Sequence, residues 1–138
     1  MPSVEGTLKV TRSLGDSPFH KDGAVSAEPA VAHVPLTPTT RFGVIASDGI
    51  WDHMSNEEVV AVCADAIRAV RPDALGGTEP PPLSKQRSNQ IASMAAAAAC
   101  EAVLDRIERG QKSGEYGSGV DDRSVAVVIF GHEQAQRA

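Results

Sequence analysis

The sequence has no long apolar run, and this absence excludes several classes of protein. No stretch reaches the roughly 18 consecutive apolar residues that a membrane-spanning helix needs. Residues 1–6 also lack the basic and apolar regions of a signal peptide. We therefore expect no membrane segment and no targeting signal, and an intracellular, cytoplasmic location.

Positive charge is scarce as well. The chain has 13 Lys and Arg residues against 18 Asp and Glu residues, which gives a formal net charge of −5. The basic residues are scattered, and no Lys/Arg run is long enough to follow a phosphate backbone. We expect no nucleic-acid partner.

Cysteine is limited to Cys63 and Cys100, both within patterns typical of helices. A reduced cysteine there acts as a small apolar side chain, so a disulfide framework is not expected. No His or Cys pair has the spacing of a zinc site. The glycine-rich residues 114–119 lack the Gly-Lys-Ser/Thr ending of a phosphate-binding loop and are interpreted as a mobile connection.

The 138 residues, 41% of them hydrophobic, are enough for one domain with a core. Short β-type runs at residues 7–11, 30–36 and 42–46 are separated by Gly and Pro and predict strands of an antiparallel sheet. Residues 124–130 form a nearly continuous apolar, β-branched run, which predicts a strand covered on both faces.

Two helices are predicted between these strands. Ser55 and Glu58 have the spacing of a capping box, and the helical periodicity that follows should end near Val70, before Pro72. A second helix is predicted for residues 88–109, with Gly110 as its stop. The Pro/Gly-rich residues 73–87 between them indicate a loop or insert. The predicted fold class is α+β.

Aspartates lie at the ends of two predicted strands. Asp48 follows residues 42–46 and precedes Gly49, while Asp121 and Asp122 precede residues 124–130. If the two strands are neighbours, these carboxylates could meet, and oxygen ligands suit Mg²⁺ or Mn²⁺. The alternative is that they are solvated turn residues.

Three segments together resemble the type 2C metal-dependent protein serine/threonine phosphatases, the PPM family. They are residues 8–16 with Glu28 and Pro29 downstream, residues 41–58, which include SDGIWD, and residues 121–129. The resemblance implies that residues 1–138 are a partial domain, the C-terminal part of an α-β-β-α sandwich with mainly antiparallel sheets.

The resemblance also implies roles for single residues. Asp48 and Asp121 correspond to ligands of two Mg²⁺ or Mn²⁺ ions, Asp52 corresponds to a residue of a third, more weakly held metal, and Asp122 is a neighbour. In this family the ions activate a water that attacks phosphoserine or phosphothreonine in phosphoprotein substrates. Arg12 resembles a structural ion-pair position, Trp51 is expected in the core, and Glu57 and Glu58 are expected to favour the helix N-terminus.

The chain departs from the family in one respect. The Asp-Gly-His-Gly-Gly stretch and the early phosphate-binding arginine have no counterpart, and His20, His33, His53 and His132 all lie outside such a context. The chain could be a fragment of a longer phosphatase, a partner of a missing N-terminal half, or a truncated relative used for binding.

We favour the fragment interpretation and predict that the isolated chain is inactive. A non-catalytic phosphatase-like protein-binding module is the alternative, and a small metal-binding domain unrelated to phosphatases is a third hypothesis. Without the missing half, the strands at 42–46 and 124–130 would expose edges or an apolar face. We therefore expect self-association of the chain through these strands.

Overall fold

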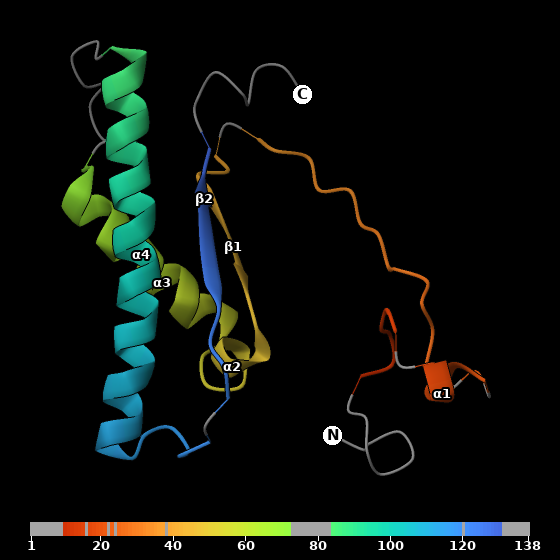
Figure 1. The fold of residues 1–138 in the computed structure, drawn as a ribbon. Helices are drawn as coiled ribbons and strands as arrows, with labels where there is room; N and C mark the ends of the chain where they lie inside the picture. Colours follow the sequence, from red (N-terminus) through yellow and green to blue (C-terminus); the bar gives the residue numbers. More distant parts are fainter. Residues whose placement is uncertain are drawn as a thin grey trace. The chain divides into compact units, whose positions relative to one another are not determined.

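A computed structural model describes residues 10–15, 17–21, 23, 25–37, 39–72, 84–119 and 121–130 (Figure 1). The chain divides into two compact units, Met1–Pro35 and Leu36–Ala138.

The first unit contains the short helix α1 (Ser17–His20) and one isolated parallel bridge between Arg12 and Ser26. The predicted strand at 30–36 is wrong, because these residues have no ladder partner among the described residues and Val31 is 88% exposed. A β-type run forms a strand only where another strand pairs with it, and Pro35 removes a donor from this run. Residues 7–9 of the other predicted strand lie outside the described residues.

The second unit contains a two-stranded antiparallel sheet of β1 (Phe42–Ala46) and β2 (Val125–Ile129). Phe42 pairs with Ile129 and Ala46 with Val125, so the expected strand neighbours do meet. One face, with Val44 and Val127, packs against the core, while Ile45 on the other face is 70% exposed. Of the two faces of β2 that were predicted to be covered, the described residues of this unit cover one.

The core lies between that sheet face and two helices, α3 (Asn56–Val70) and α4 (Lys85–Ser113) (Figure 1). Buried side chains recur along α4 at every fourth position, and two of the four are alanines that let α3 approach closely. The fully or nearly fully buried core residues are Ile50, Met54, Val59, Cys63, Ile67, Ala95, Ala99, Val103 and Ile107. This arrangement confirms the α+β fold class.

The ends of α3 follow the prediction. Ser55 Oγ accepts a hydrogen bond of 3.1 Å from the Glu58 N–H, and the helix ends at Val70. Cys63 and Cys100 are free, as expected. Burial, with a smaller contribution from Cys100, raises the pKa of the Cys63 thiol to about 11, so this residue acts as an apolar core side chain.

Helix α4 is longer than predicted at both ends. It begins at Lys85, so residues 85–87 are helical, whereas residues 73–83 of the predicted insert lie outside the described residues. It ends at Ser113, and Gly114 follows with a left-handed φ of 78°. Gly110 is therefore not the stop, and it is buried inside the helix. No helix in the described part of the chain is long and apolar enough to cross a membrane.

Candidate metal centre

Asp48 is presented by a tight junction at the end of β1. It is the first residue of the short helix α2 (Asp48–Trp51), and its Oδ1 accepts a hydrogen bond of 3.0 Å from the Gly49 N–H. Its side chain is exposed. The indole Nε1 of Trp51 donates to the Ala46 carbonyl at 2.9 Å, which ties the end of α2 to β1.

The position of Trp51 corrects a prediction. Trp51 is 37% exposed, and the core position of this segment is taken by Ile50, which is fully buried. An aromatic next to a turn was expected to pack inward, but here a hydrogen bond from its ring fastens it across the turn.

Asp121 lies on the second segment of the candidate site, four residues before β2. It is exposed, and its Oδ1 accepts a hydrogen bond of 2.8 Å from the Asp122 N–H. Asp52 lies one turn after Asp48, at the end of α2, and its backbone N–H donates to the Asp48 carbonyl at 2.8 Å. Its side chain is also exposed.

Ser47 joins these two segments. Its hydroxyl accepts a hydrogen bond from the Ser124 N–H at 3.0 Å and donates one to the Asp122 carbonyl at 3.1 Å. Its own N–H donates to the Ser124 carbonyl at 2.9 Å, which extends the β1–β2 ladder by one step. Ser47, directly before Asp48, is thus held against the backbone of Asp122 and Ser124, just after Asp121.

Gly49 makes the same junction possible sterically. A Cβ at this position would lie 2.5 Å from the Asp122 carbonyl oxygen and 3.2 Å from its carbon. These are backbone atoms that cannot rotate away, so the close approach needs glycine. The sequence pattern predicts only a turn at Gly49 and gives no signal for Ser47, because the partner of both residues is about 75 residues away in sequence.

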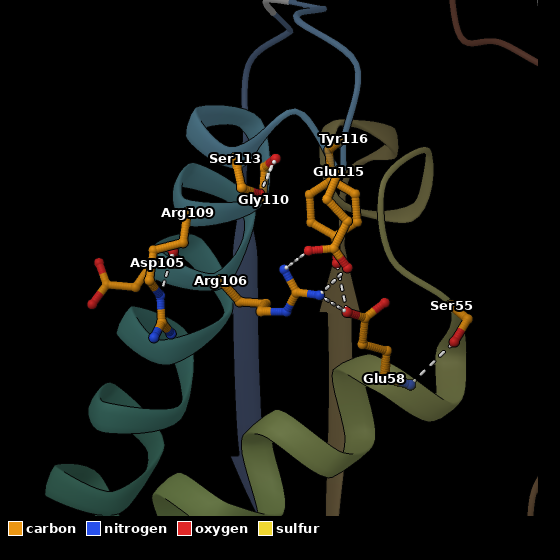
Figure 2. Close-up of polar contacts among 9 residues, drawn as sticks. All are labelled: Ser55, Glu58, Asp105, Arg106, Arg109, Gly110, Ser113, Glu115 and Tyr116. Atoms are coloured by element: carbon orange, nitrogen blue, oxygen red, sulfur yellow. Dashed lines mark hydrogen bonds and ion pairs between the residues drawn. The ribbon is translucent and has the colours of Figure 1, made fainter.

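A second polar cluster, formed by Glu58, Arg106, Glu115 and Tyr116, lies between the N-terminus of α3 and the end of α4 (Figure 2). The Arg106 guanidinium donates to both Glu115 carboxylate oxygens, at 2.6 and 3.1 Å, and pairs with Glu58 at 2.7 Å. It also lies 4.8 Å from the centre of the Tyr116 ring. The Tyr116 hydroxyl donates to Glu58 Oε1 at 2.5 Å.

The cluster shifts the pKa values of Glu115 and Tyr116. The hydrogen bond from Arg106 holds the pKa of Glu115 below its usual range. Burial first, and then the hydrogen bond to Glu58, raise the pKa of Tyr116 to about 12. Glu58, expected only to favour the helix N-terminus, also links α3 to the segment after α4.

The segment after α4 is also held at its start. The Tyr116 N–H donates to the Gly110 carbonyl at 3.1 Å, and a Cβ on Gly110 would overlap the Tyr116 ring (Figure 2). Residues 114–119, which composition indicated as a mobile connection, thus make contacts with α3 and α4 that composition does not reveal. Their mobility stays a prediction.

The donor chemistry at the junction fits part of a metal site. Asp48, Asp52 and Asp121 carry exposed carboxylates, and carboxylate oxygens are what Mg²⁺ and Mn²⁺ bind. Two or three such groups are fewer than the roughly six ligands of an octahedral Mg²⁺. Within the described ranges, no three His, Cys, Asp or Glu side chains are grouped so that they could hold a metal ion by themselves.

The other residues singled out in the sequence have different surroundings. His53 is half-buried, with its ring centre 5.8 Å from that of Tyr116, and His33 is exposed. His132 lies outside the described residues. Arg12 is exposed and makes a backbone bridge to Ser26, while the ion pair expected for it stays a prediction.

Comparison with known proteins decides the family. The family model described as "Protein phosphatase 2C" matches residues 1–103. This chain belongs to the protein phosphatase 2C family. The match includes the β1–α2 junction with Asp48 and Asp52 and ends before Asp121.

Several plant proteins are similar to this phosphatase 2C chain. "Probable protein phosphatase 2C 64" of Arabidopsis thaliana is 38% identical over 147 aligned residues, which cover 92% of this chain and 33% of that protein. The "Protein kinase and PP2C-like domain-containing protein" of Oryza sativa subsp. japonica is 46% identical over 61 residues, covering 44% of this chain and 9% of that protein. "Probable protein phosphatase 2C 44" of the same rice is 37% identical over 71 residues, 51% of this chain and 20% of that protein.

The chain therefore spans no more than about a third of the length of these relatives. No solved structure gives a significant match to it.

Proposed function

We propose that this chain is the C-terminal half of the catalytic domain of a protein serine/threonine phosphatase that hydrolyses phosphoserine and phosphothreonine in protein substrates. Membership of the phosphatase 2C family supports the reaction class. The observation that carries the proposal is the Ser47 junction, because it holds the chain next to Asp48 against the chain next to Asp121.

Asp48 and Asp121 are assigned as ligands of two Mg²⁺ or Mn²⁺ ions, and Asp52 as a candidate ligand of a third. When bound, such ions lower the pKa of a water and offset charge on phosphoryl oxygens. The chain's own contribution is to present these carboxylates on short backbone segments that hydrogen bonds hold in place. Little conformational entropy is then lost when a metal ion binds. Carboxylates brought close together repel one another, and a cation removes that cost.

The exposed sheet face supports a second layer. Ile45 is 70% and Val128 47% exposed on the face opposite the helices, and each strand has one edge with no partner among the described residues. A face of this kind is normally covered. We assign it to the missing N-terminal half, which would complete the α-β-β-α sandwich.

In the isolated chain a second copy is expected to cover this face. Light scattering should then detect dimers or larger species. A strictly monomeric chain over a wide concentration range would contradict this part of the proposal.

The role of Asp48 is tested in a longer protein that includes the N-terminal half. Asp48→Asn should lower Mn²⁺-dependent hydrolysis of a phosphothreonine peptide by about 100-fold or more, because it removes a charged ligand. Asp65→Asn is the matched control, since Asp65 is exposed on α3 and pairs with Arg68. Unchanged activity of the Asp48 variant would remove Asp48 from the site.

The 138-residue chain alone should show no turnover, because it supplies too few ligands. Robust hydrolysis by the purified chain would overturn the half-site account. A non-catalytic protein-binding module is the second candidate. Mn²⁺-dependent hydrolysis by the longer protein would exclude that alternative.

A further inference from the structure

The side chain of Gln111 uses both ends of its amide on the segment around Asp121. Its Nε2 donates to the Gly117 carbonyl and to the Gly119 carbonyl, each at 3.1 Å. Its Oε1 accepts a hydrogen bond of 2.6 Å from Arg123. A primary amide has two N–H donors, and here both are engaged by one loop.

These contacts lie on both sides of Asp121. Gly119 is two residues before Asp121 and Arg123 is two residues after it, so one side chain on the rigid helix α4 holds the chain at both points. Arg123 also lies beside the Asp48 junction. A Cβ built on Gly49 would be only 3.3 Å from Arg123 Cγ. Three glycines in residues 114–119 would otherwise leave this backbone with wide conformational freedom.

We propose that Gln111 is a positioning residue for the candidate metal centre. It holds residues 117–119 and Arg123 against α4 and thereby sets the place of Asp121 relative to Asp48. The inference rests on the proposed role of Asp121 as a metal ligand. Gln111 belongs to none of the motifs that indicated the family, and its function is visible only when α4 and the loop are seen together.

Two substitutions separate its contacts. Gln111→Ala removes all three hydrogen bonds. Gln111→Glu keeps an acceptor for Arg123 but places carboxylate oxygens against the carbonyl oxygens of Gly117 and Gly119, where two donors are needed. Lys112→Ala is the matched control, because Lys112 is the next residue of α4 and pairs with Glu108 on the exposed surface.

The experiment uses the 138-residue chain labelled with ¹⁵N. Backbone relaxation reports the order of residues 117–119, and titration with Mn²⁺ reports paramagnetic broadening of the Gly49 and Asp122 amide signals. Both Gln111 variants should show increased fast motion of the loop. The Mn²⁺ concentration that gives half of the full broadening at Asp122 should rise about threefold. This is less than the ~10-fold or greater loss of metal affinity that is typical when a residue bonded directly to a metal ligand is replaced.

The possible outcomes are distinct. Unchanged loop order in both variants would overturn the proposal, and so would a mobile loop with unchanged broadening. A Lys112→Ala variant that behaves like the Gln111 variants would also contradict it, since the effect would then belong to the helix end in general. If the unsubstituted chain shows no broadening at either amide, the proposed metal role of Asp121 is contradicted, and the positioning role of Gln111 is contradicted with it. The relaxation data then still show whether Gln111 orders the loop, which separates the two results.

Discussion

The Ser47 hydroxyl makes two hydrogen bonds to the chain segment that carries Asp121 and Asp122. Both of its partners are backbone groups, so the bonds are independent of side-chain rotamers on that segment. Beside it, Gly49 leaves the Asp122 carbonyl just enough room. At the scale of single residues, the candidate site is thus defined as much by a serine and a glycine as by its carboxylates.

Ser47→Ala should lower the free energy of unfolding by about 1 kcal/mol, because it removes two partly solvated hydrogen bonds. Urea unfolding measures this loss, and faster amide exchange at Ser124 should accompany it. Ser113→Ala, which removes a bond of 3.0 Å to the Gly110 carbonyl, is the control for losing a hydroxyl elsewhere. Unchanged exchange at Ser124 would show that the hydroxyl does not hold the junction.

Gly49→Ala should destabilise the chain by about 1 to 3 kcal/mol. Alanine normally stabilises a helix relative to glycine by up to ~1 kcal/mol. Here its Cβ would lie 2.5 Å from a backbone oxygen, and the steric cost of that contact exceeds the gain in helix propensity. Gly117→Ala is the comparison, since a Cβ there meets nothing within 4 Å. A stability gain in the Gly49 variant would contradict the close approach of the two segments.

At the scale of elements, α3 and α4 differ in how far the sequence could predict them. The capping serine, the periodicity and the terminating proline of α3 all lie within one short window, and its ends were predicted closely. The end of α4 depends on Tyr116, whose ring lies against Gly110 and whose hydroxyl reaches Glu58 on α3. The sequence pattern does not predict that contact, and for this reason the prediction that α4 ends at Gly110 is wrong.

The cluster around Tyr116 gives a prediction for high pH. Tyr116 is the only tyrosine, so ultraviolet titration of phenolate follows it alone, and its midpoint should lie near 12. Because the folded pKa is raised above the ordinary value of 10, this group's contribution to stability is complete below pH 10 and is lost as the pH rises toward 12.

Burial is the largest cause of the raised Tyr116 pKa and remains in Glu58→Gln, but the substitution removes the charge that opposes phenolate formation, so the midpoint should fall part of the way from about 12 toward 10. Far-UV circular dichroism over the same range is the control for unfolding. In the unsubstituted chain, a midpoint near 10 while the chain remains folded would contradict the half-buried, hydrogen-bonded hydroxyl.

At the scale of the whole molecule, the family, the α+β class and the meeting of the two strands could be predicted from the sequence. The SDGIWD segment carries a specific signal, and strand-end carboxylates are local features. Two features could not be predicted from the sequence: the path of residues 30–36 and the covering of β2 on one face. Both depend on which other segments pack against them. Ser47 and Gln111 were missed for the same reason.

The most direct measurement of the central claim is a Mn²⁺ titration of the ¹⁵N-labelled chain of 138 residues. If Asp48 and Asp121 supply one side of a metal site, the amides of Gly49 and Asp122 should broaden together at the same Mn²⁺ concentrations, before the amide of the exposed Asp65 on α3. Asp48→Asn should weaken the effect at both amides. Broadening that is absent, or that affects the two segments at unrelated concentrations, would contradict the claim that this chain carries half of a phosphatase metal centre.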